Sequence, residues 1–540
     1  MTDIANVDGL RPLARRPKFD WSLVVFGLLT AILVGLVVYP MSRLLIESFS
    51  DPKTGSFTVA NFFDVARRSR YLLAYWHTVQ LAVVTVIMSV AMALPMAWIL
   101  LAGPNAGWIN QIWTSLTGIE DPLVNIFSLW GLAFVIALNV FPLIFIFATS
   151  ALDLISSEME EAAAIHGAGP MRTTWIITLP LALPAILGAI MLVFLETIAL
   201  YGTPALIAIP ARFNVATTQL TTFFEYPAKI ELAMAFSVPL VLITVVLLGA
   251  QRLLLRGGHV AVSGKGGART AMRVGRWKWL FLAHGVAVTL LAVILPAGIL
   301  VSTSFQIAWA KAPVLSNLTL DNYRAILFEQ ATVREAMFNT VYFALASATA
   351  CTILGFLTAY VVIRKLIPYS SALAFLAVAP VAVPGIVLAI CFYAAFAGPP
   401  FSLYGSSLII ILAFITRFLP IAFVSCASGI RSLNPELEEA VRIHGGSRMR
   451  AMVEVVAPVL KKSLMGVWIL VFVICSRELS TAMFLTSHQN RVISILTLDM
   501  SEQGDYETLA AMGVVLLVVT STVVAIGMRL LGRDFMLRRN

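Results

Sequence analysis

Eleven apolar runs, most of them long enough to cross a lipid bilayer, dominate the 540 residues of this chain. A helix needs about 20 apolar residues to span the hydrocarbon core. The runs lie near residues 21–45, 77–102, 128–150, 181–208, 231–251, 277–301, 337–363, 371–397, 405–428, 463–484 and 508–531. Because 59% of the residues are hydrophobic and only 12% are charged, the chain cannot cover a water-exposed surface with polar groups. The sequence therefore predicts an all-α, polytopic membrane protein and excludes a soluble enzyme, a disordered chain and a nucleic-acid-binding domain.

Basic residues predict how the chain is oriented in the membrane. The net charge is +9, and Lys and Arg gather at the cytoplasmic ends of spans. Four of them precede the first run, namely Arg11, Arg15, Arg16 and Lys18. That run, from Trp21 to about Leu45, is too long for the core of a cleaved signal peptide. We therefore expect a cytoplasmic N-terminus, and the basic tail RDFMLRRN predicts a cytoplasmic C-terminus.

A basic, glycine-rich segment divides the chain into two halves. Residues 252–276 carry six basic residues, no acidic residue and the stretch GGHVAVSGKGG. This composition is typical of a flexible cytoplasmic linker. We expect residues 1–251 to form the first half, with five clear spans, and residues 277–540 to form the second half, with six.

One segment occurs in both halves. Residues 160–180 (EEAAAIHGAGPMRTTWIITLP) align without a gap with residues 438–458 (EEAVRIHGGSRMRAMVEVVAP), and nine of the 21 positions are identical. Unrelated segments would share about one or two positions. Each copy is polar and lies between two spans. The alignment therefore predicts an internal duplication that includes a loop outside the bilayer.

Each copy of this loop predicts a short helix that ends at a glycine. Glu-Glu-Ala is followed by an apolar residue and then by His-Gly, and glycine is the usual residue just beyond a helix end. We expect two such helices, one from each half, on the same side of the membrane. Either they merely connect spans, or a partner outside the membrane docks on both. The duplication at identical spacing favours docking.

The duplicated loops resemble the EAA motif of binding-protein-dependent ABC importer permeases. The first copy matches the motif at Glu161, Ala162, Ala163, Gly167, Ile177, Leu179 and Pro180. The second copy matches it at Glu439, Ala440, Gly445 and Pro458, and has Val441, Val455 and Ala457 at other motif positions. The resemblance implies the type I (MetI-like) permease fold, with two homologous six-helix-type halves, 11–12 transmembrane helices and a translocation pathway between the halves.

In that family the loop forms the coupling helix, which docks on a cytoplasmic ATPase. The resemblance implies this role for residues 158–170 and 436–448, within the EAA loops 158–180 and 436–458. It implies the coupling residues Glu160, Glu161, Ala162, Gly167, Glu438, Glu439, Ala440 and Gly445. It implies two ABC ATPase subunits and a periplasmic substrate-binding protein as partners, in a bacterial inner membrane. It also implies that ATP is hydrolysed in the separate subunits, so that this chain is not an enzyme and needs no cofactor.

The cargo and the competing classes are less constrained. Fusion of both halves in one chain is typical of the ferric-iron importer subfamily, so ferric iron is the expected cargo. Thiamine, aminoethylphosphonate or a polyamine fits the same motifs. An ion-coupled secondary transporter also uses duplicated halves and buried carboxylates, but it gives no reason for the paired loops. A membrane-bound enzyme would need a cluster of catalytic side chains, which the sequence lacks.

Four charged residues fall inside predicted spans, where ionisable groups are costly and often functional. They are Glu196, Arg417, Arg477 and Glu478. Glu196 and the pair Arg477-Glu478 occupy similar places, each in the span after a duplicated loop. Either these charges neutralise one another at helix contacts, or they line the translocation pathway.

Histidine and cysteine residues predict no metal site. His166 and His444 belong to the duplicated loops, where a lone histidine more often caps the helix end. The cysteines lie in apolar stretches, without a CxxC pattern or a nearby histidine, and we expect them to be packing thiols. They are Cys351, Cys391, Cys426 and Cys475.

The span count of the first half raises a conflict. If the N-terminus and both loops are cytoplasmic, an even number of spans must precede the first loop, yet only three are clear. The distance from residue 77 to residue 161 is 84 residues, whereas the comparable distance from residue 337 to residue 439 is 102. About one short span is missing. Either residues 103–127 cross in a weakly apolar or broken helix, or the 77–102 region is divided between two crossings.

Overall fold

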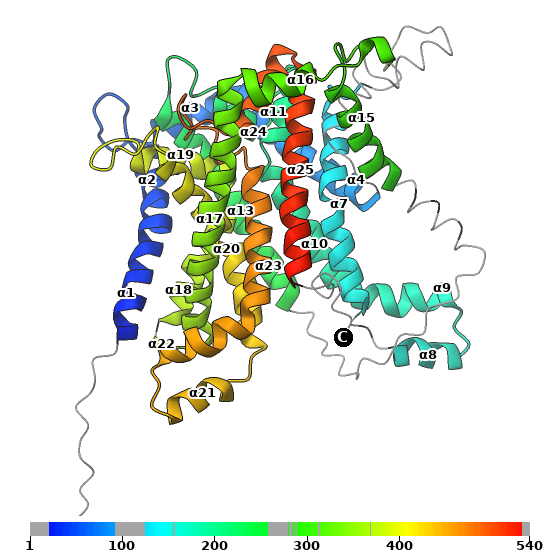
Figure 1. The fold of residues 1–540 in the computed structure, drawn as a ribbon, viewed down its shortest axis with the longest axis vertical. Coiled ribbons are helices and arrows are strands. Elements are labelled where there is room, and N and C mark those ends of the chain that lie inside the picture. Colours follow the sequence, from blue (N-terminus) through cyan, green and yellow to red (C-terminus); the bar gives the residue numbers. More distant parts are fainter. Residues whose placement is uncertain are drawn as a thin grey trace, which may run out of the picture.

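The computed structural model describes residues 21–91, 125–256 and 289–531, apart from residues 154, 156, 312, 313 and 368, and also residues 279, 283 and 286. Every named secondary-structure element in this part of the chain is a helix. Nine helical stretches of the described chain are long and apolar enough to cross a membrane. The all-α membrane architecture that the sequence predicts is therefore confirmed (Figure 1).

The described helices lie in two stretches, one before and one after the predicted linker. The first half contains α1 (Trp21–Leu33), η1 (Val34–Val38), α2 (Tyr39–Ser48), α3 (Ala60–Arg67), α4 (Ser69–Ala91), α7 (Leu129–Asp153), α8 (Ser157–Ile165), α9 (Pro170–Thr173), η2 (Thr174–Thr178), α10 (Leu179–Ala199), α11 (Gly202–Ala208), α12 (Ala216–Thr221) and α13 (Ile230–Arg256). The second contains η4 (Leu290–Ile294), α15 (Leu295–Ser304), η5 (Leu315–Asn317), α16 (Asp321–Arg324), η6 (Ala325–Glu329), α17 (Ala331–Ile363), α18 (Ser370–Val378), η7 (Ala379–Ala382), α19 (Gly385–Phe396), α20 (Ser407–Arg431), α21 (Glu436–Ile443), α22 (Arg448–Ala451), η8 (Met452–Val456), α23 (Ala457–Ser476), α24 (Ile493–Gln503) and α25 (Tyr506–Leu531). Most of the predicted linker lies outside the described residues.

The duplication extends far beyond the repeated loop. Helices α7 and α20 both have 25 residues, and the second begins 278 residues after the first, which is the spacing of the repeated loops. The halves also repeat a side-chain contact between distant elements. The hydroxyl oxygen of Thr78 accepts a hydrogen bond from the backbone N–H of Ala216 (2.6 Å), and that of Thr340 accepts one from the backbone N–H of Ile493 (2.9 Å). Both halves therefore have the same tertiary design.

Four wide helical turns mark the positions of prolines. Four of the five π-helical segments of the described residues, namely η1, η2, η4 and η8, are each followed by an α-helix whose second residue is a proline, whereas η6 is not. These prolines are Pro40, Pro180, Pro296 and Pro458. A proline ring clashes with the carbonyl four residues earlier, and a wider turn relieves this clash. The prolines shared by the two loops therefore shape the entry into α10 and α23.

These turns correct two predicted spans. The structure has one continuous helical stretch from Thr174 to Ala199 and another from Arg448 to Ser476, whereas the apolar runs predict spans near 181–208 and 463–484. The second part of each repeated segment therefore belongs to a span and not to the loop. The predicted spans also end too late, because α11 and the turn after α23 are separate from them.

The first half has fewer residues than the second half in the interval between α4 and α7. The Ser89 hydroxyl donates to the carbonyl of Ala137, 48 residues later, and the Cys351 thiol donates to the carbonyl of Ile415, 64 residues later. These contacts are equivalent, so the first half has 16 fewer residues in this interval. The second half uses the interval for α18, η7 and α19. Residues 92–124 are not among those described, so the two explanations that the sequence offers for residues 77–127 remain open.

The second half shows how the chain returns between two parallel spans. Cys351 contacts Ile415, and a Cβ at Gly355, one turn later, would meet the backbone of Ala422 at 2.9 Å, so α17 and α20 run in the same direction. The intervening return path is broken. The helices 370–382 and 385–396 meet at an angle of 112°, which corrects the prediction of one straight span over 371–397.

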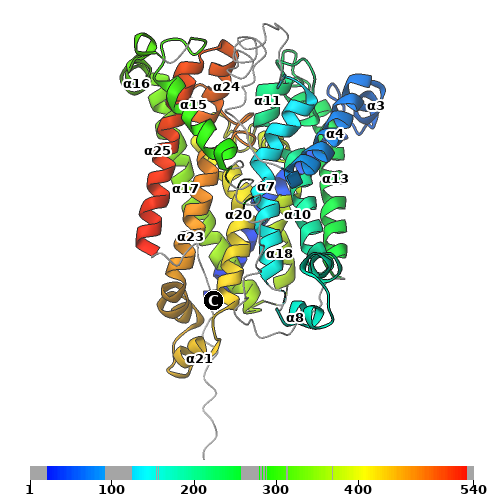
Figure 2. The same cartoon turned by 90° about the vertical axis from the view of Figure 1, so that its right-hand side faces the viewer.

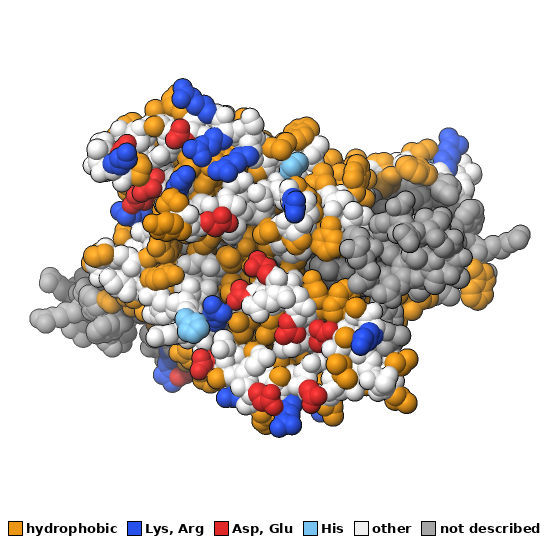
Figure 3. Space-filling view, turned by 90° about the horizontal axis from the view of Figure 1, so that it is seen from above, with side chains coloured by type: hydrophobic (Ala, Val, Ile, Leu, Met, Phe, Trp, Pro, Cys, Tyr) orange, Lys and Arg blue, Asp and Glu red, His pale blue; other side chains and the backbone are white. Residues whose placement is uncertain are grey.

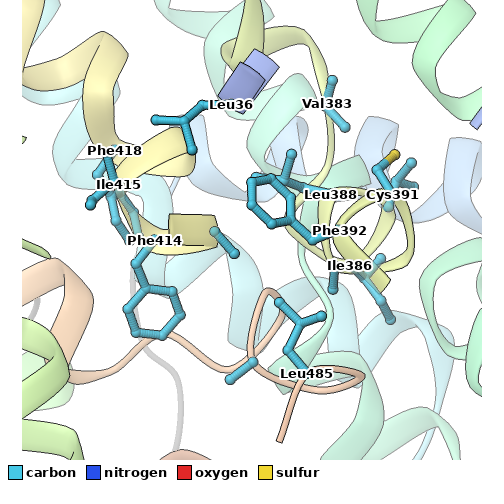
Figure 4. Close-up of a cluster of buried hydrophobic side chains, with 14 of the residues drawn as sticks. Leu36, Val383, Ile386, Leu388, Cys391, Phe392, Phe414, Ile415, Phe418 and Leu485 are labelled. Carbon is cyan, nitrogen blue, oxygen red and sulfur yellow. The ribbon is translucent and has the colours of Figure 1, made fainter. Parts of the chain in front are cut away.

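The first helices of the chain pack against the second half. The Tyr39 hydroxyl in α2 donates to the carbonyl of Ala395 in α19 (3.2 Å). One buried cluster contains side chains from both halves, and Figure 4 shows Leu36 of η1 close to Phe418 and Ile415 of α20. This cluster ties the two halves together across the bundle.

Candidate functional site: the paired loop helices and the break in the bundle

The repeated loops form helices α8 and α21, which lie on the same side of the molecule, away from α11, α16 and α24 (Figures 1 and 2). The prediction of two loop helices on one side is confirmed. We call the side of α8 and α21 the loop-helix face and the opposite side the outer face. Figure 3 looks onto the outer face and shows acidic and basic side chains spread over it.

A glycine in the left-handed conformation ends each loop helix, as predicted. Gly167 has φ +78° and Gly445 has φ +80°. The chain reverses just after each of them: the N–H of Ala168 donates to the carbonyl of Ala163, and the N–H of Gly446 donates to that of Val441, both at 2.9 Å. A Cβ at Gly167 or Gly445 would meet no atom within 4 Å, so the backbone conformation, not lack of space, calls for glycine.

The loop histidines cap the helix ends, as predicted. Nδ1 of His166 lies 2.9 Å from the carbonyl oxygen of Ala162, and Nδ1 of His444 lies 2.8 Å from that of Ala440. Since a carbonyl only accepts hydrogen bonds, Nδ1 carries the proton in both. The described residues contain no group of three or more His, Cys, Asp or Glu side chains that could hold a metal ion. All four cysteines are buried and free, as expected for packing thiols.

Each loop helix presents an isoleucine to solvent at the same position. Ile165 is 83% exposed and Ile443 is 82% exposed. Ala162 and Ala440, one turn earlier, are exposed too, as is Glu439. The side chains of Glu160 and Glu161 are outside the described part of the structure. Two separate surfaces with an apolar centre are thus available to a partner on this face.

Glu438 differs from the other predicted coupling residues whose side chains the structure describes, because it is buried. Its carboxylate pairs with the guanidinium of Arg364 at the end of α17, with Nη2 2.7 Å from Oε1. The Tyr360 hydroxyl donates to its other oxygen at 2.8 Å. Both partners belong to α17, a transmembrane helix. Glu438 therefore fastens α21 to the bundle and does not lie on the exposed surface.

Arg417 lies at the break between η7 and α19. It is half-buried near the middle of α20, and its Nη1 donates to the carbonyl of Val383 at 2.8 Å. That carbonyl belongs to the non-helical residue between the two bent helices, where the helical hydrogen-bond ladder is interrupted. Arg417 therefore supplies a donor at the point where the backbone changes direction by 112°.

Glu478 approaches the same break. Its Oε1 accepts hydrogen bonds from the N–H and the hydroxyl of Thr481, and a Cβ at Gly385 would lie 3.2 Å from this atom. Gly385 is the first residue of α19, and the N-terminus of a helix favours a negative charge. The structure thus brings two of the predicted pathway residues, Arg417 and Glu478, to one break in the bundle.

The other two predicted pathway residues lie elsewhere. Glu196 is an exposed residue inside α10, and Arg477 is an exposed residue just after α23. By the spacing of the repeat, Glu196 corresponds to Ile474, so the expectation that Glu196 and Glu478 occupy similar places is wrong by about one helical turn. The salt bridges of the described residues include none of the four charges, so the structure contradicts mutual neutralisation.

Replacing Arg417 by methionine is expected to loosen the break. The Val383 carbonyl would lose its donor, which costs about 1–3 kcal/mol for a buried group. Cys391 lies in the adjoining helix α19 and is buried, so in a background without the other cysteines its maleimide labelling should become about ten times faster. Arg431→Met, at the exposed end of α20, is the matched control. Equal labelling of both variants would show that Arg417 does not hold the break.

The comparison with protein families gives the class of the chain. A model described as "Binding-protein-dependent transport system inner membrane component" matches residues 71–257 and, a second time, residues 351–536. The two matches cover more than half of the chain, one in each half. The chain therefore belongs to this family, the multi-pass permease subunits of ABC importers. This membership favours the ABC importer permease over the secondary transporter that shares its duplicated halves.

The individual relatives share less than a third of their aligned residues with this chain. The chain is 28% identical to the ferric transport system permease protein FbpB of Actinobacillus pleuropneumoniae over 428 residues, which are 78% of this chain and 61% of the relative. It is 27% identical to the putative ferric transport system permease protein FbpB 1 of Haemophilus influenzae over 68% of this chain and 58% of the relative. The chain thus spans about three-fifths of the length of these relatives.

A solved structure of a bacterial alginate ABC transporter, in complex with an alginate pentasaccharide-bound periplasmic protein, is also similar. It is 16% identical with a TM-score of 0.39, over 49% of this chain and 99% of that chain.

Several features of the site were not predicted from the sequence. One feature of the sequence could have indicated that Ile165 and Ile443 are exposed, because the same apolar residue occurs at the same place in two polar loops. No feature of the sequence indicated the ion pair of Arg364 with Glu438, because these residues lie 74 positions apart. Contacts between the halves on the outer face were missed for the same reason. The rings of Phe224 and Phe484 stack there, with centroids 4.0 Å apart.

Proposed function

We propose that this chain is the translocation subunit of an ATP-driven importer of ferric iron in a bacterial inner membrane. The observation that carries the proposal is the pair of matching loop helices on one face. Each ends in a left-handed glycine and presents an exposed isoleucine. Two equal surfaces on one face call for two equal partners, so we assign one ATPase subunit to α8 and one to α21.

The coupling residues fall into two groups in this proposal. Glu161, Ala162, Glu439 and Ala440 belong to the surfaces that meet the ATPases, and Gly167 and Gly445 set the ends of those surfaces. Glu438 acts as a positioning residue, because its ion pair with Arg364 joins α21 to a transmembrane helix. We extend the same role to Glu160, its counterpart in the first loop. ATP-driven movement of a partner would then reach the bundle through α17.

The loop-helix face is the cytoplasmic face in this proposal. The start of α1 and the end of α25 lie towards it, which fits cytoplasmic termini (Figure 1). A periplasmic binding protein would dock on the outer face, over residues 47–76, 305–336 and 483–507. The expected halves, residues 1–251 and 277–540, each contribute one loop helix and part of the outer face. Residues 252–276 would be the cytoplasmic linker.

Transport would proceed by rocking of the two halves about their contacts. On the outer face the halves touch through the stacked rings of Phe224 and Phe484, and a Cβ at Gly202 would lie 3.0 Å from Leu479. No pair of elements with substantial contact links α8 or α9 to the second half within the described residues. This arrangement fits a state closed to the outside. The break held by Arg417, with Glu478 beside it, lies on our proposed pathway.

Ferric iron is the proposed cargo because the relatives cited above carry it in their names. A spermidine/putrescine permease of Haemophilus influenzae, 23% identical over 38% of this chain, keeps a polyamine as the second candidate. Thiamine and aminoethylphosphonate rest only on the resemblance of the fused halves.

Purification of the tagged chain from its native membrane tests the function. We expect an ATPase and a binding protein to co-purify. Vesicles that contain the complex should take up ⁵⁵Fe³⁺ with ATP and not with a nonhydrolysable analogue, and unlabelled polyamine or thiamine should not compete. ATP-dependent uptake of one of those compounds in place of iron would change the cargo. Recovery of the chain without any ATPase, with uptake intact, would contradict the whole proposal.

Valine at both loop glycines is expected to reduce cargo uptake by about tenfold or more. A β-branched residue at φ near +80° costs about 1–2 kcal/mol, and the helix end must change conformation to avoid this cost. The measurement is uptake per ATP hydrolysed by the Gly167→Val/Gly445→Val complex. Gly169→Val is the matched control, because Gly169 has open space around it and no positive φ. If both variants transport equally, the loop ends play no part in coupling.

A further inference from the structure

A hollow of about 460 Å³ opens on the outer face of the first half. It lies between the start of α4, residues 209–215, α12 and residues 222–229. Polar groups form its floor. The Nδ1–H of His77 donates to the carbonyl of Asn214 at 2.9 Å, and the amide of Asn214 donates to Gln219 at 3.3 Å. The hollow is far from the loop helices and is not part of the break at Arg417.

Three cations border this hollow. Arg70, Arg212 and Lys229 line it and are exposed, and none of them has an ion pair with a described residue. Glu225 is the one acidic side chain in the lining. The hollow therefore has a net positive charge, which favours a negatively charged occupant.

One of these cations is held in place by contacts of its side chain. The guanidinium of Arg70 lies 4.8 Å from the centre of the Tyr71 ring, and its Nη2 donates to the Tyr71 hydroxyl at 2.9 Å. Tyr71 is itself fixed, since it is fully buried against Phe223 and Phe236. Arg212 has φ +58°, a conformation that is unfavourable for any residue other than glycine and that recurs at functional sites. Because its guanidinium is already fixed against Tyr71, Arg70 loses little conformational entropy when it binds an anion.

In the corresponding region of the second half, a cation pairs with a carboxylate of the same chain. There Asn339 donates to the carbonyl of Arg491 at 3.1 Å, as His77 donates to Asn214. Arg491 pairs with Asp499 of the adjoining helix, with Nη1 3.1 Å from Oδ2. The second half thus supplies both the cation and the carboxylate.

The first half has these cations but no carboxylate at the position of Asp499. The equivalent contacts of Ala216 and Ile493 give an offset of 493 − 216 = 277 in this region, so Thr222 stands where the second half has Asp499. Conversely, Arg212 stands where the second half has Gln489 by the same offset of 277. Arg70 stands where it has Thr332, by the offset of 340 − 78 = 262 that relates Thr78 of α4 to Thr340 of α17. A carboxylate from outside the chain would complete in the first half the kind of pair that the second half forms internally.

We propose that the hollow bordered by Arg70, Arg212 and Lys229 receives an acidic side chain of the binding protein that delivers the cargo. The inference rests on the proposed function, and it adds a specific contact and a specific half. The cations are exposed at an open rim, where a side chain that projects from a large body can reach them. The hollow also has room for more than one carboxylate, so a segment of protein fits it better than a single small anion does.

The test uses the complex of the full-length chain with its co-purified ATPase, reconstituted in lipid nanodiscs. The probe is the cargo-loaded binding protein recovered with it. We measure the concentration of this protein that gives half-maximal stimulation of ATP hydrolysis. Arg70→Glu and Arg212→Glu should each raise this half-maximal concentration about tenfold or more, because a charge-assisted contact becomes a repulsion. Arg212→Gln should raise the half-maximal concentration less than Arg212→Glu does. High salt should reduce the difference in this concentration between each variant and the unaltered chain.

Lys311→Glu is the matched control, because Lys311 is an exposed cation on the outer face beyond the hollow. It should leave the half-maximal concentration unchanged. All variants must elute as the unaltered complex does and retain the ATPase. The Arg212→Glu defect should be repaired by an Asp→Lys or Glu→Lys substitution at one acidic position of the binding protein, which identifies the occupant.

Three results would overturn the inference. In the first, the arginine variants respond to the binding protein as Lys311→Glu does. In the second, citrate binds the complex in calorimetry without the binding protein and Arg212→Glu abolishes that binding alone, which would make the hollow a site for a free anion. In the third, no binding protein co-purifies at all, and then the proposed function fails and takes this inference with it.

Discussion

Replacing Ile165 and Ile443 together by aspartate is expected to abolish the recovery of the ATPase with this chain. Each side chain is more than four-fifths exposed in the chain alone, and burial of an isoleucine at an interface contributes about 2 kcal/mol. Loss of that burial weakens each contact about 30-fold, and a buried aspartate without a partner adds a further cost. The measurement is the ATPase-to-permease ratio after affinity purification, with ATP-dependent cargo uptake as the second readout.

The single variants separate the two docking surfaces. Ile165→Asp and Ile443→Asp should each leave about one ATPase per permease, because the surfaces lie on separate helices. Leu315→Asp is the control, since Leu315 is 90% exposed on the outer face and should not alter the ratio. A double variant that still recovers two ATPases would mean that the partner docks elsewhere.

Removing one partner of the buried ion pair between Arg364 and Glu438 is expected to loosen the attachment of α21 to α17. Glu438→Ala leaves a guanidinium that is 14% exposed without its carboxylate and deprives the Tyr360 hydroxyl of its acceptor. We expect a cost of about 2–4 kcal/mol. Because the pair fastens α21 to α17, the cost should fall on this contact. Amide hydrogen exchange over residues 433–446 should accelerate about 30-fold or more, and cargo uptake should fall while the ATPase still binds at α8.

A double variant distinguishes the ion pair from simple loss of packing. Glu438→Gln with Arg364→Met has no unpaired charge, so exchange in α21 should be slower than in Glu438→Ala. Glu454→Gln is the matched control, because the pair of Glu454 with Arg450 in the next helical segment is more than half exposed and contributes little. The positioning role is contradicted if exchange in the Glu438 variant is no faster than in this control.

Local patterns account for the features that were predicted correctly. The length of the apolar runs predicts a helical membrane protein, because a backbone in lipid must satisfy its own hydrogen bonds. The repeated Glu-Ala and His-Gly pattern predicts α8 and α21, their glycine ends and their capping histidines, because each of these contacts joins residues within about one helical turn. The expected family follows from the same two segments and agrees with the family match.

The span predictions that were wrong are those in which hydropathy alone was used to place the end of a helix. The apolar run continues beyond Ser476, so Arg477 and Glu478 were expected inside a span, whereas α23 ends there and Glu478 turns towards α19. The run over 371–397 gives no sign of its 112° break. A broken helix and a straight one bury the same apolar residues, so hydropathy does not distinguish them.

By itself, the sequence determined the class of protein, its division into two related halves, the common face of the loop helices and the glycines at their ends. Only the tertiary structure decided which loop residues are free to meet a partner. It buried Glu438 against α17 and left Ile443 exposed, although the two lie on the same short helix. It also placed Arg417 beside Val383, 34 residues away, and gathered the cations of the hollow from α4 and from residues 209–229. The physical reason is that exposure, pairing and charge balance depend on contacts between distant segments, and no local spacing encodes those contacts.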